Sequence, residues 1–389
     1  MHVRDLAALL VMTVALPARA ADVPELLRLT ARPATLALTA NLQQEATVET
    51  LARPVTLLPE GQTGKLTMEG AATLRLHVAT TTPGTVLWIA GEGDETFERF
   101  EPGASATWGP TTYGPTVYVA AEGDGAVEVT RLAIGVVDTG GPASACLKDL
   151  ACASTVDLPE VAEASRAIAM LRFVRGDGSY VCTGALLDDK ANSGTPYLLT
   201  ARHCISTQEE AASIEAVWDE RSETCGGDSG IRRKQTRTYG AQLLVSSAET
   251  DMALLRLDRV PPNRVFLGVE LEPVPAGTPT YRLSHAGGLP QTYTTGVARD
   301  DGPGCASAPR PQFIYTSPSY GAVAMGSSGA PLLLPGLRVA GQLTGRCGPS
   351  PDDACAIYND SVDGAIAASW PLLARYLDPA VGRRHAAWH

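Results

Sequence analysis

Residues 325–331 read Met-Gly-Ser-Ser-Gly-Ala-Pro and run directly into the apolar segment 332–334. Glycines on both sides of a serine pair allow a tight backbone turn that leaves amide N–H groups close to a hydroxyl. Acyl transfer needs this arrangement, because a nucleophilic oxygen must stand beside donors that hold a developing oxyanion. We therefore expect Ser328 to be a nucleophile, with the backbone N–H groups of Gly326 and Ser328 as its oxyanion hole. Such turns are common in loops, so the segment needs supporting motifs.

Two upstream segments supply the partners that such a serine requires. Residues 197–204 form a short β-type run that contains His203, and residues 250–257 place Asp251 at the start of another apolar run. The order His, Asp, Ser is one of the few orders known for a serine-centred triad. The pattern predicts His203 as general base and acid, a role that imidazole fills near neutral pH. It predicts Asp251 as the carboxylate that orients the ring.

With these motifs the chain resembles the chymotrypsin-fold (trypsin-like) serine peptidases. The Thr-Ala-Arg-His-Cys run at 200–204 and the Gly-Ser-Ser-Gly-Ala-Pro run at 326–331 carry the resemblance. It implies an all-β fold of the double β-barrel type and hydrolysis of protein or peptide substrates through an acyl-enzyme, without a cofactor. A catalytically silent chymotrypsin-like binding protein is one alternative. An α/β-hydrolase esterase is another, but that motif needs glycine where Ala330 stands and a histidine after the serine, which His385 would have to supply.

Charge and the N-terminal residues bear on partners and compartment. The 389-residue chain has a formal net charge of −11 and a pI near 5.1, which argues against nucleic acid as a main partner. Residues 1–20 are typical of a secretory signal peptide, because Arg4 precedes an apolar run too short to span a bilayer and small residues follow at 18–20. We expect a secreted or periplasmic monomer with no membrane attachment after cleavage, in a compartment where cysteines form disulfides.

The first third of the chain has the pattern of a separate β-rich unit. Residues 73–78 and 116–120 alternate apolar and polar side chains, which predicts strands and a β-sandwich over 21–140. Turns are expected at 83–84, 109–110 and 114–115, where glycine and proline adjoin.

Cysteine usage changes at the expected domain boundary. The first of eight cysteines is Cys146, and Gly140-Gly141-Pro142 just before it reads as a linker. We therefore expect a possible pro-domain over 21–140, a trypsin-like peptidase domain over 141–380 and a tail over 381–389. Zinc is an unfavoured use of the cysteines, because no Cys-x-x-Cys pair occurs.

From Cys146 onward the chain is similar to the bacterial lysyl endopeptidase subgroup. The cysteines near the start, the Gly-Ser-Ser-Gly turn, Gly341-Gln342-Leu343 and the Leu-Asp-Pro run at 377–379 carry this closer resemblance. It implies four disulfides, with Cys305 and Cys347 left for each other because they depart from the subgroup. The implied pairs are Cys182–Cys204, Cys152–Cys225, Cys146–Cys355 and Cys305–Cys347. The choice between Cys347 and Cys355 as partner of Cys146 stays open.

The predicted preference for the substrate residue before the cleaved bond rests on acidic residues that the subgroup resemblance suggests. In trypsin the pocket acid lies six residues before the nucleophile, where this chain has Ala322. The subgroup takes its acid from the loop after Gly341-Gln342-Leu343, a loop that opens with Thr344 and Gly345. Asp360 fits that position best and Asp363 is the other possibility, so cleavage after Lys or Arg is expected. A pocket that takes small apolar side chains is the alternative.

The residue before the nucleophile differs from trypsin in a way that bears on activation. Trypsin-type zymogens form a salt bridge between a new N-terminal ammonium and an aspartate at this position, whereas this chain has Ser327. Activation, where it occurs, must then work by another route, such as removal or displacement of residues 21–140.

Overall fold

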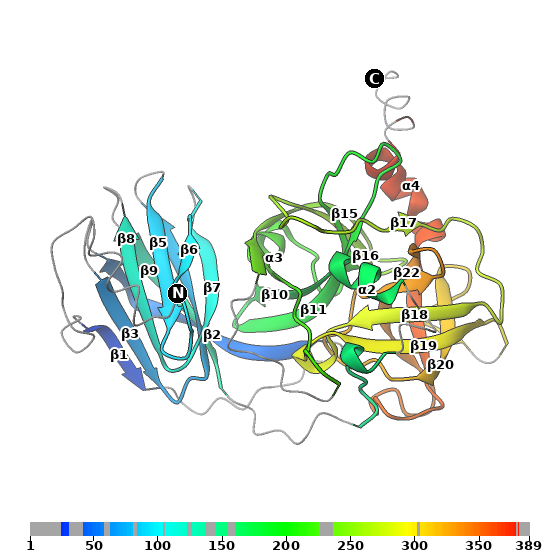
Figure 1. The fold of residues 1–389 in the computed structure, drawn as a ribbon, viewed down its shortest axis with the longest axis horizontal. Coiled ribbons are helices and arrows are strands. Elements are labelled where there is room, and N and C mark those ends of the chain that lie inside the picture. The colour runs from blue at the N-terminus through cyan, green and yellow to red at the C-terminus, as the bar shows by residue number, and fades with distance from the viewer. Residues whose placement is uncertain are drawn as a thin grey trace.

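Strands account for most of the regular structure and form three sheets (Figure 1). The computed structural model describes residues 25–30, 42–57, 63–80, 84–103, 106–122, 127–136, 145–153, 160–225, 236–301, 304–378 and 380. Within these residues the α-helices are α2 (Val161–Ala164), α3 (Gln208–Ala212) and α4 (Ile366–Leu377). The predicted all-β fold is confirmed.

The first nine strands form two layers around an apolar core. One layer is the sheet β1-β3-β8-β5-β6, and the other consists of β2, β9, β4 and β7. Side chains from both layers, among them Leu66, Leu76 and Val117, are buried in one cluster. The expected boundary at 140–141 lies outside the described residues. The strands are β1 (Glu25–Thr30), β2 (Gln43–Leu57), β3 (Thr63–Glu69), β4 (Thr73–Thr80), β5 (Val86–Gly91), β6 (Glu98–Phe100), β7 (Thr107–Tyr113), β8 (Thr116–Glu122) and β9 (Val127–Gly135).

One predicted turn in this region is wrong. Gly109 and Pro110 lie inside β7, where they belong to a strand rather than to a connection. Pro110 has no backbone N–H to donate. It is tolerated there because β7 is the edge strand of its sheet. The Gly114-Pro115 turn is confirmed between β7 and β8, with Gly114 at φ 97°.

The remaining strands form two barrel-like sheets, as predicted for the chymotrypsin type (Figure 1). In the first, β12 pairs with both β11 and β16, and in the second β22 pairs with both β21 and β23. The first comprises β10 (Ile168–Arg175), β11 (Gly178–Leu187), β12 (Tyr197–Ala201), β13 (Glu215–Trp218), β14 (Thr236–Tyr239), β15 (Ala241–Ser247) and β16 (Met252–Leu257). The second comprises β17 (Gly268–Val269), β18 (Pro279–Ser284), β19 (Thr292–Arg299), β20 (Phe313–Tyr320), β21 (Pro331–Leu334), β22 (Arg338–Cys347) and β23 (Asp360–Ala365).

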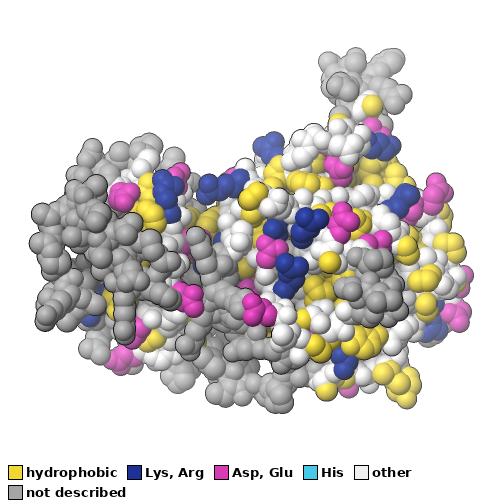
Figure 2. Space-filling view, viewed as in Figure 1, with side chains coloured by type: hydrophobic (Ala, Val, Ile, Leu, Met, Phe, Trp, Pro, Cys, Tyr) yellow, Lys and Arg dark blue, Asp and Glu magenta, His cyan; other side chains and the backbone are white. Residues whose placement is uncertain are grey.

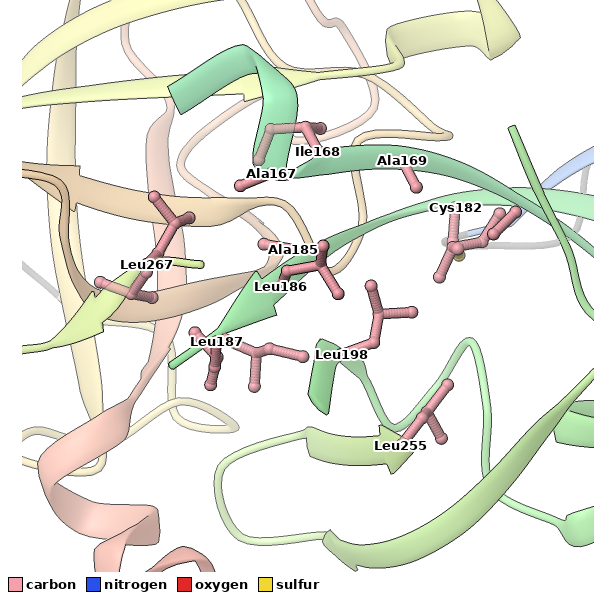
Figure 3. Packing of buried hydrophobic residues seen from close by; sticks show 14 of the residues in the cluster. Ala167, Ile168, Ala169, Cys182, Ala185, Leu186, Leu187, Leu198, Leu255 and Leu267 are labelled. Atoms are coloured by element: carbon pink, nitrogen blue, oxygen red, sulfur yellow. The ribbon is translucent and has the colours of Figure 1, made fainter. Parts of the chain in front are cut away.

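The two barrels share one hydrophobic cluster. Leu186, Leu198 and Leu255 belong to the first barrel, and Leu283 and Leu333 belong to the second, yet all five lie fully buried in the same cluster. Figure 3 shows how part of this cluster converges from β10, β11, β12 and β16. Because buried apolar area provides most folding free energy, the contact between the barrels is expected to be permanent.

Strand β2 joins the N-terminal layers to the first barrel. Its residues Gln43 to Thr47 pair antiparallel with Val181 to Gly178 of β11, so one continuous sheet crosses from one unit to the other (Figure 1). The linker at 140–142, which the sequence suggested as the connection, lies outside the described residues. A direct sheet between the units was not predicted, because strand pairing across some 130 residues leaves no local signal.

Polar side chains surround this junction and centre on Glu215, which is fully buried. Arg237 and Arg172 approach its carboxylate at 3.4 and 3.7 Å, and the Thr111 N–H donates to it at 3.0 Å. Burial alone would raise the pKa of Glu215, but Arg237, Arg75 and Arg172 hold it at about 2. The N-terminal unit therefore covers a charge network that would otherwise face water.

Four disulfides connect the peptidase region. They are Cys182–Cys204, Cys152–Cys225, Cys146–Cys355 and Cys305–Cys347, the pairs that the subgroup resemblance implied. The Cys182–Cys204 bond ties β11 to the residue next to His203. None of the described helices is long and apolar enough to cross a membrane.

Candidate active site

Strand pairing brings two of the predicted site residues together. His203 follows β12 and Asp251 precedes β16, and these strands pair antiparallel with Ala201 opposite Met252. The end of one strand therefore lies beside the start of the other. The backbone N–H of Arg202 donates to the carbonyl oxygen of Asp251 at 2.7 Å, which ties the two loops together.

His203 and Asp251 form a close pair. The ring Nδ1 lies 2.6 Å from Oδ2, and the backbone N–H of His203 donates to Oδ1 at 2.8 Å. Two contacts to one carboxylate fix both the position and the orientation of the imidazole. The other ring nitrogen, Nε2, is buried and has no hydrogen-bond partner among the described residues. It is the atom that a general base would use.

The turn around Ser328 depends on glycine at two positions. Gly326 and Gly329 have φ of 89° and 82°, a region that side chains rarely adopt. A Cβ on Gly326 would lie 2.5 Å from the carbonyl oxygen of His285, and one on Gly329 would lie 2.5 Å from that of Thr183. The turn is thus pressed against β11 and against the loop that contains His285.

Hydrogen bonds from Thr183 hold this turn on the first barrel. Its backbone N–H donates to the carbonyl oxygen of Ser328 at 2.9 Å, and its hydroxyl donates to that of Gly326 at 2.9 Å. Ser328 belongs to the second barrel, whereas Thr183 follows Cys182, whose disulfide reaches Cys204 beside His203. The Ser328 turn and the His203 loop are therefore anchored to the same strand.

Ser327 stands where trypsin has an aspartate, and its hydroxyl contacts only neutral hydrogen-bonding groups among the described residues. Its side chain is fully buried, and its hydroxyl lies 3.0 Å from that of Ser284, which in turn lies 3.0 Å from that of Thr292. The Ala324 N–H also donates to the Ser327 hydroxyl at 3.3 Å. Neutral hydroxyls thus fill a site that a salt bridge would occupy in a trypsin-type zymogen.

His285 is a buried neighbour of the site to which the sequence assigned no role. Its side chain is fully buried, its Nδ1 lies 3.0 Å from the Leu289 carbonyl oxygen, and its backbone N–H donates to the Thr183 hydroxyl. Burial lowers its pKa to about 4, although the Leu289 carbonyl opposes the shift. The ring is therefore neutral at neutral pH and supports the backbone behind Gly326. The Gly287-Gly288 pair after His285 was the sign in the sequence that the backbone turns sharply here, and both glycines have positive φ.

One group of potential metal ligands lies at the site. Atoms of Cys182, His203 and Cys204 lie within 4.8 Å of one another. Both sulfur atoms belong to one disulfide, so neither can be the thiolate that a metal requires.

Backbone hydrogen bonds bring part of the predicted pocket, on β22, next to the Ser328 turn. Gly329 N–H donates to the Leu343 carbonyl oxygen at 2.8 Å, and Leu343 N–H donates to that of Ala330 at 2.9 Å. Thr344 and Gly345 follow at once. The Thr344 hydroxyl is buried without a hydrogen-bond partner among the described residues.

Both predicted pocket acids are paired with arginines, a contact that the sequence did not predict. Asp363 is fully buried and paired with Arg282 at 2.7 Å, and Asp360 is paired with Arg299 at 3.3 Å. Burial raises the pKa of Asp363 and of Asp360, and the arginine partners oppose that shift. Sequence reasoning missed these partners because Arg282 and Arg299 lie on other strands, β18 and β19. Ala322 lines a cavity that contains neither aspartate.

Comparisons with known proteins place the peptidase region in context. A family model described as lysyl endopeptidase, C-terminal domain, matches residues 140–359. The lysyl endopeptidase of Pseudomonas aeruginosa is 28% identical over 261 residues, which cover 61% of this chain and 56% of that protein. The chain thus spans about half the length of this relative. Among solved structures, an HtrA-type protease, AlgW, with a tripeptide is 19% identical over 59% of this chain and 65% of that chain, with a TM-score of 0.41. The active form of the Rv3671c protease from M. tuberculosis is 19% identical over 61% of this chain and 93% of that chain, with a TM-score of 0.39.

Proposed function

Because the chain belongs to the lysyl endopeptidase family, whose C-terminal-domain model matches more than half of it, we propose that it is a serine endopeptidase. The observation that carries the proposal is the His203–Asp251 pair, held by two contacts, with the other ring nitrogen left without a described partner. Ser328 would be the nucleophile, because its turn is fixed on the strand to which the histidine loop is disulfide-bonded.

The proposed reaction uses only side chains and backbone of this chain. The Ser328 hydroxyl attacks the scissile carbonyl while His203 Nε2 takes its proton and later gives it to the leaving amine. Asp251 holds the ring in the required tautomer and stabilises the imidazolium. The N–H groups of Gly326 and Ser328 would receive the oxyanion, because the positive φ of Gly326 turns this segment sharply just before the nucleophile.

We propose an extracytoplasmic location and protein or peptide substrates. Four disulfides support an oxidising compartment, and the expected signal peptide at 1–20 lies outside the described residues. On the face in Figure 2, basic and acidic side chains lie near one another between hydrophobic and neutral ones. A monomeric state remains part of the proposal.

The preference for Lys or Arg is the weaker part of the sequence prediction. The name of the Pseudomonas relative supports it, and Asp360 or Asp363 would have to supply the charge. The arginine partners of both acids count against it, because a substrate cation would compete with a formed ion pair.

A serine-directed fluorophosphonate tests the enzyme against the catalytically silent alternative. We expect the purified full chain to be labelled on Ser328, and we expect Ser328→Ala to abolish labelling. Ser327→Ala is the matched control, since it removes the neighbouring hydroxyl and should still be labelled. An unlabelled wild-type protein with a correct circular dichroism spectrum would favour the silent reading, and labelling lost only in Ser327→Ala would mean that the motif is displaced by one residue.

A further inference from the structure

A buried ion pair lies in the second barrel next to the segment that contains Ser328. Arg282 on β18 and Asp363 on β23 are 2% and 0% exposed, and Nη1 of the arginine lies 2.7 Å from Oδ1 of the aspartate. A second contact joins Nη2 to Oδ2 at 2.9 Å. Arg282 lines the cavity beside Ala322, whereas Asp363 is absent from its described lining, so the carboxylate faces the guanidinium rather than the cavity. Removing two charges from water is costly, so such a pair is weak evidence for stability by itself.

The guanidinium also holds the backbone next to the proposed nucleophile. Its Nη1 donates to the carbonyl oxygen of Ala330 at 3.0 Å, two residues after Ser328. The same oxygen accepts the backbone N–H of Leu343 at 2.9 Å. Leu343 in turn stands opposite Asp363 in the β22–β23 register. The ion pair, the Leu343 backbone and the Ser328 turn therefore form a closed ring of contacts.

Strand β18 supports the turn on both sides of the nucleophile. Ser284, two residues after Arg282, has its hydroxyl 3.0 Å from that of Ser327. Residues two apart in a strand point to the same face, so this face of β18 contacts the turn once before Ser328 and once after it. The contact before Ser328 joins two neutral hydroxyls. The contact after it is charge-assisted, and such hydrogen bonds are about twice as strong as neutral ones.

We propose that Arg282 and Asp363 are positioning residues, which hold the Ser328 turn and its oxyanion-hole N–H groups in the geometry for attack. Asp363 fixes the guanidinium, and the guanidinium fixes the Ala330 carbonyl oxygen. Both act through backbone contacts rather than on the reacting atoms. Placement matters because a shift of about 1 Å at a reacting group can cost about 100-fold in rate. This inference rests on the proposed peptidase function, and it assigns Asp363 to the turn rather than to the substrate pocket.

Asp363→Asn tests the pair, since it keeps the shape of the side chain and removes the counter-charge of Arg282. We expect kcat to fall about 10- to 100-fold with little change in KM, because substrate still binds while the reacting groups are misplaced. The rate at which a fluorophosphonate without a peptide segment labels Ser328 should fall by the same factor. The loss should appear with Lys and with Ala before the cut.

A double variant, Arg282→Met with Asp363→Leu, separates positioning from folding. It leaves neither charge of the pair behind, and such replacements are often neutral or stabilising. It lacks the donor to the Ala330 carbonyl oxygen, so we expect a folded protein that is labelled as slowly as Asp363→Asn. Glu215→Gln is the matched control, because it also removes a carboxylate from a buried charge network, but at the N-terminal boundary. It should be labelled at the wild-type rate.

The outcomes separate this inference from the peptidase function. A wild-type chain that is not labelled would remove both. Labelling of folded Asp363→Asn at the wild-type rate would overturn the inference alone, and where that variant does not fold, the rate of the double variant decides in the same way. A loss confined to the Lys peptide, with labelling unchanged, would make Asp363 a pocket acid and would also overturn the inference.

Discussion

The molecule has two internal boundaries, and they are built from different interactions. Between the two barrels the contact is apolar, with Leu283 and Leu333 in the same cluster as residues of the first barrel. Between the N-terminal layers and the first barrel, a small apolar cluster that joins Trp108 to Val174 is accompanied by β2–β11 pairing and a buried charge network around Glu215. Apolar side chains have no group that titrates, whereas paired charges respond to protonation. The difference indicates a permanent barrel pair and an N-terminal unit whose attachment depends on conditions.

Each boundary also contains a paired carboxylate, and the two have different tasks. Asp251 at the barrel contact is partly accessible and holds a histidine that must change its protonation state during the proposed reaction. Glu215 at the other boundary is fully buried among arginines that stay charged. Removing the Asp251 carboxylate should therefore stop catalysis with little loss of stability. Removing the Glu215 carboxylate should reduce stability with little effect on catalysis.

The largest expected effect is that of Asp251→Asn. The amide keeps the shape but stabilises the wrong tautomer of His203, so kcat should fall by about 10⁴. The thermal midpoint should change little, because the side chain is neither fully buried nor part of a core. Steady-state rates with any cleaved peptide, together with a melting curve, check both. A loss of less than about tenfold would show that Asp251 does not orient the base.

Glu215→Gln should be the most destabilising substitution at the N-terminal boundary. It removes the fully buried counter-charge that Arg237 and Arg172 share, and each arginine keeps one partner, Glu98 and Glu45 respectively. The loss should therefore lie below the about 3–5 kcal/mol of a buried charge left with no partner. Urea denaturation of the full chain measures the change. Glu270→Gln is the control, because its partner Arg338 is half exposed and the pair should contribute less than about 1 kcal/mol. Equal effects of the two substitutions would contradict the assigned role of Glu215.

Leu333→Ala probes the apolar boundary in the same way. Leu333 is fully buried, and truncating such a leucine costs about 2–5 kcal/mol through lost burial and the cavity that remains. Unlike the loss in Glu215→Gln, this loss should be the same at neutral pH and below pH 4.5, which urea denaturation at two pH values can compare. A loss in Leu333→Ala that shrinks on acidification would show that the two boundaries do not differ as described.

Acidification should act through different buried groups in different pH ranges. The folded-state pKa of His285 is about 4 against an ordinary 6.5, so the unfolded chain binds more protons between these values. Stability is therefore complete above pH 6.5 and falls as the pH drops toward 4, by up to about 3 kcal/mol. His77, whose pKa burial also lowers to about 4, acts in the same direction. The pKa of Glu215 is about 2 against 4.5, so its contribution is lost only between pH 4.5 and 2.

The variant His285→Asn separates these contributions. It keeps a hydrogen-bond donor toward the Leu289 carbonyl but cannot be protonated, so unfolding free energy should depend less steeply on pH between 6.5 and 4 than in wild type. Below pH 4 the two proteins should run parallel. An unchanged slope above pH 4 would assign the acid sensitivity to His77 or to other groups.

The smallest expected effect is that of Ser327→Ala. The substitution removes one hydroxyl contact to Ser284, and a buried hydrogen bond contributes about 1 kcal/mol. Peptidase activity should largely persist, because the hydroxyl supports the turn without reaching the substrate. A complete loss of activity in a folded Ser327→Ala protein would make this hydroxyl part of the reaction.

The sequence alone indicated the all-β class and the two barrels, and the structure brings together His203 and Asp251 of the predicted site. His203, Asp251 and Ser328 stand in short motifs. The backbone conformation of the serine motif depends on neighbouring glycines, Gly326 and Gly329, which have positive φ, so such a motif can be recognised from the sequence. The disulfide pairs followed from resemblance to a subgroup, and the structure contains the same pairs.

Only the tertiary structure decided which charges meet. Asp360 and Asp363 are candidate pocket acids in the sequence, and their partners Arg299 and Arg282 lie 61 and 81 residues away. The contacts of Glu215 depend in the same way on which strands become neighbours. A charged side chain has no pattern that names its partner, because pairing requires only proximity in the fold. Apolar periodicity and turn chemistry act within a few residues, which is why the sequence revealed them and not the ion pairs.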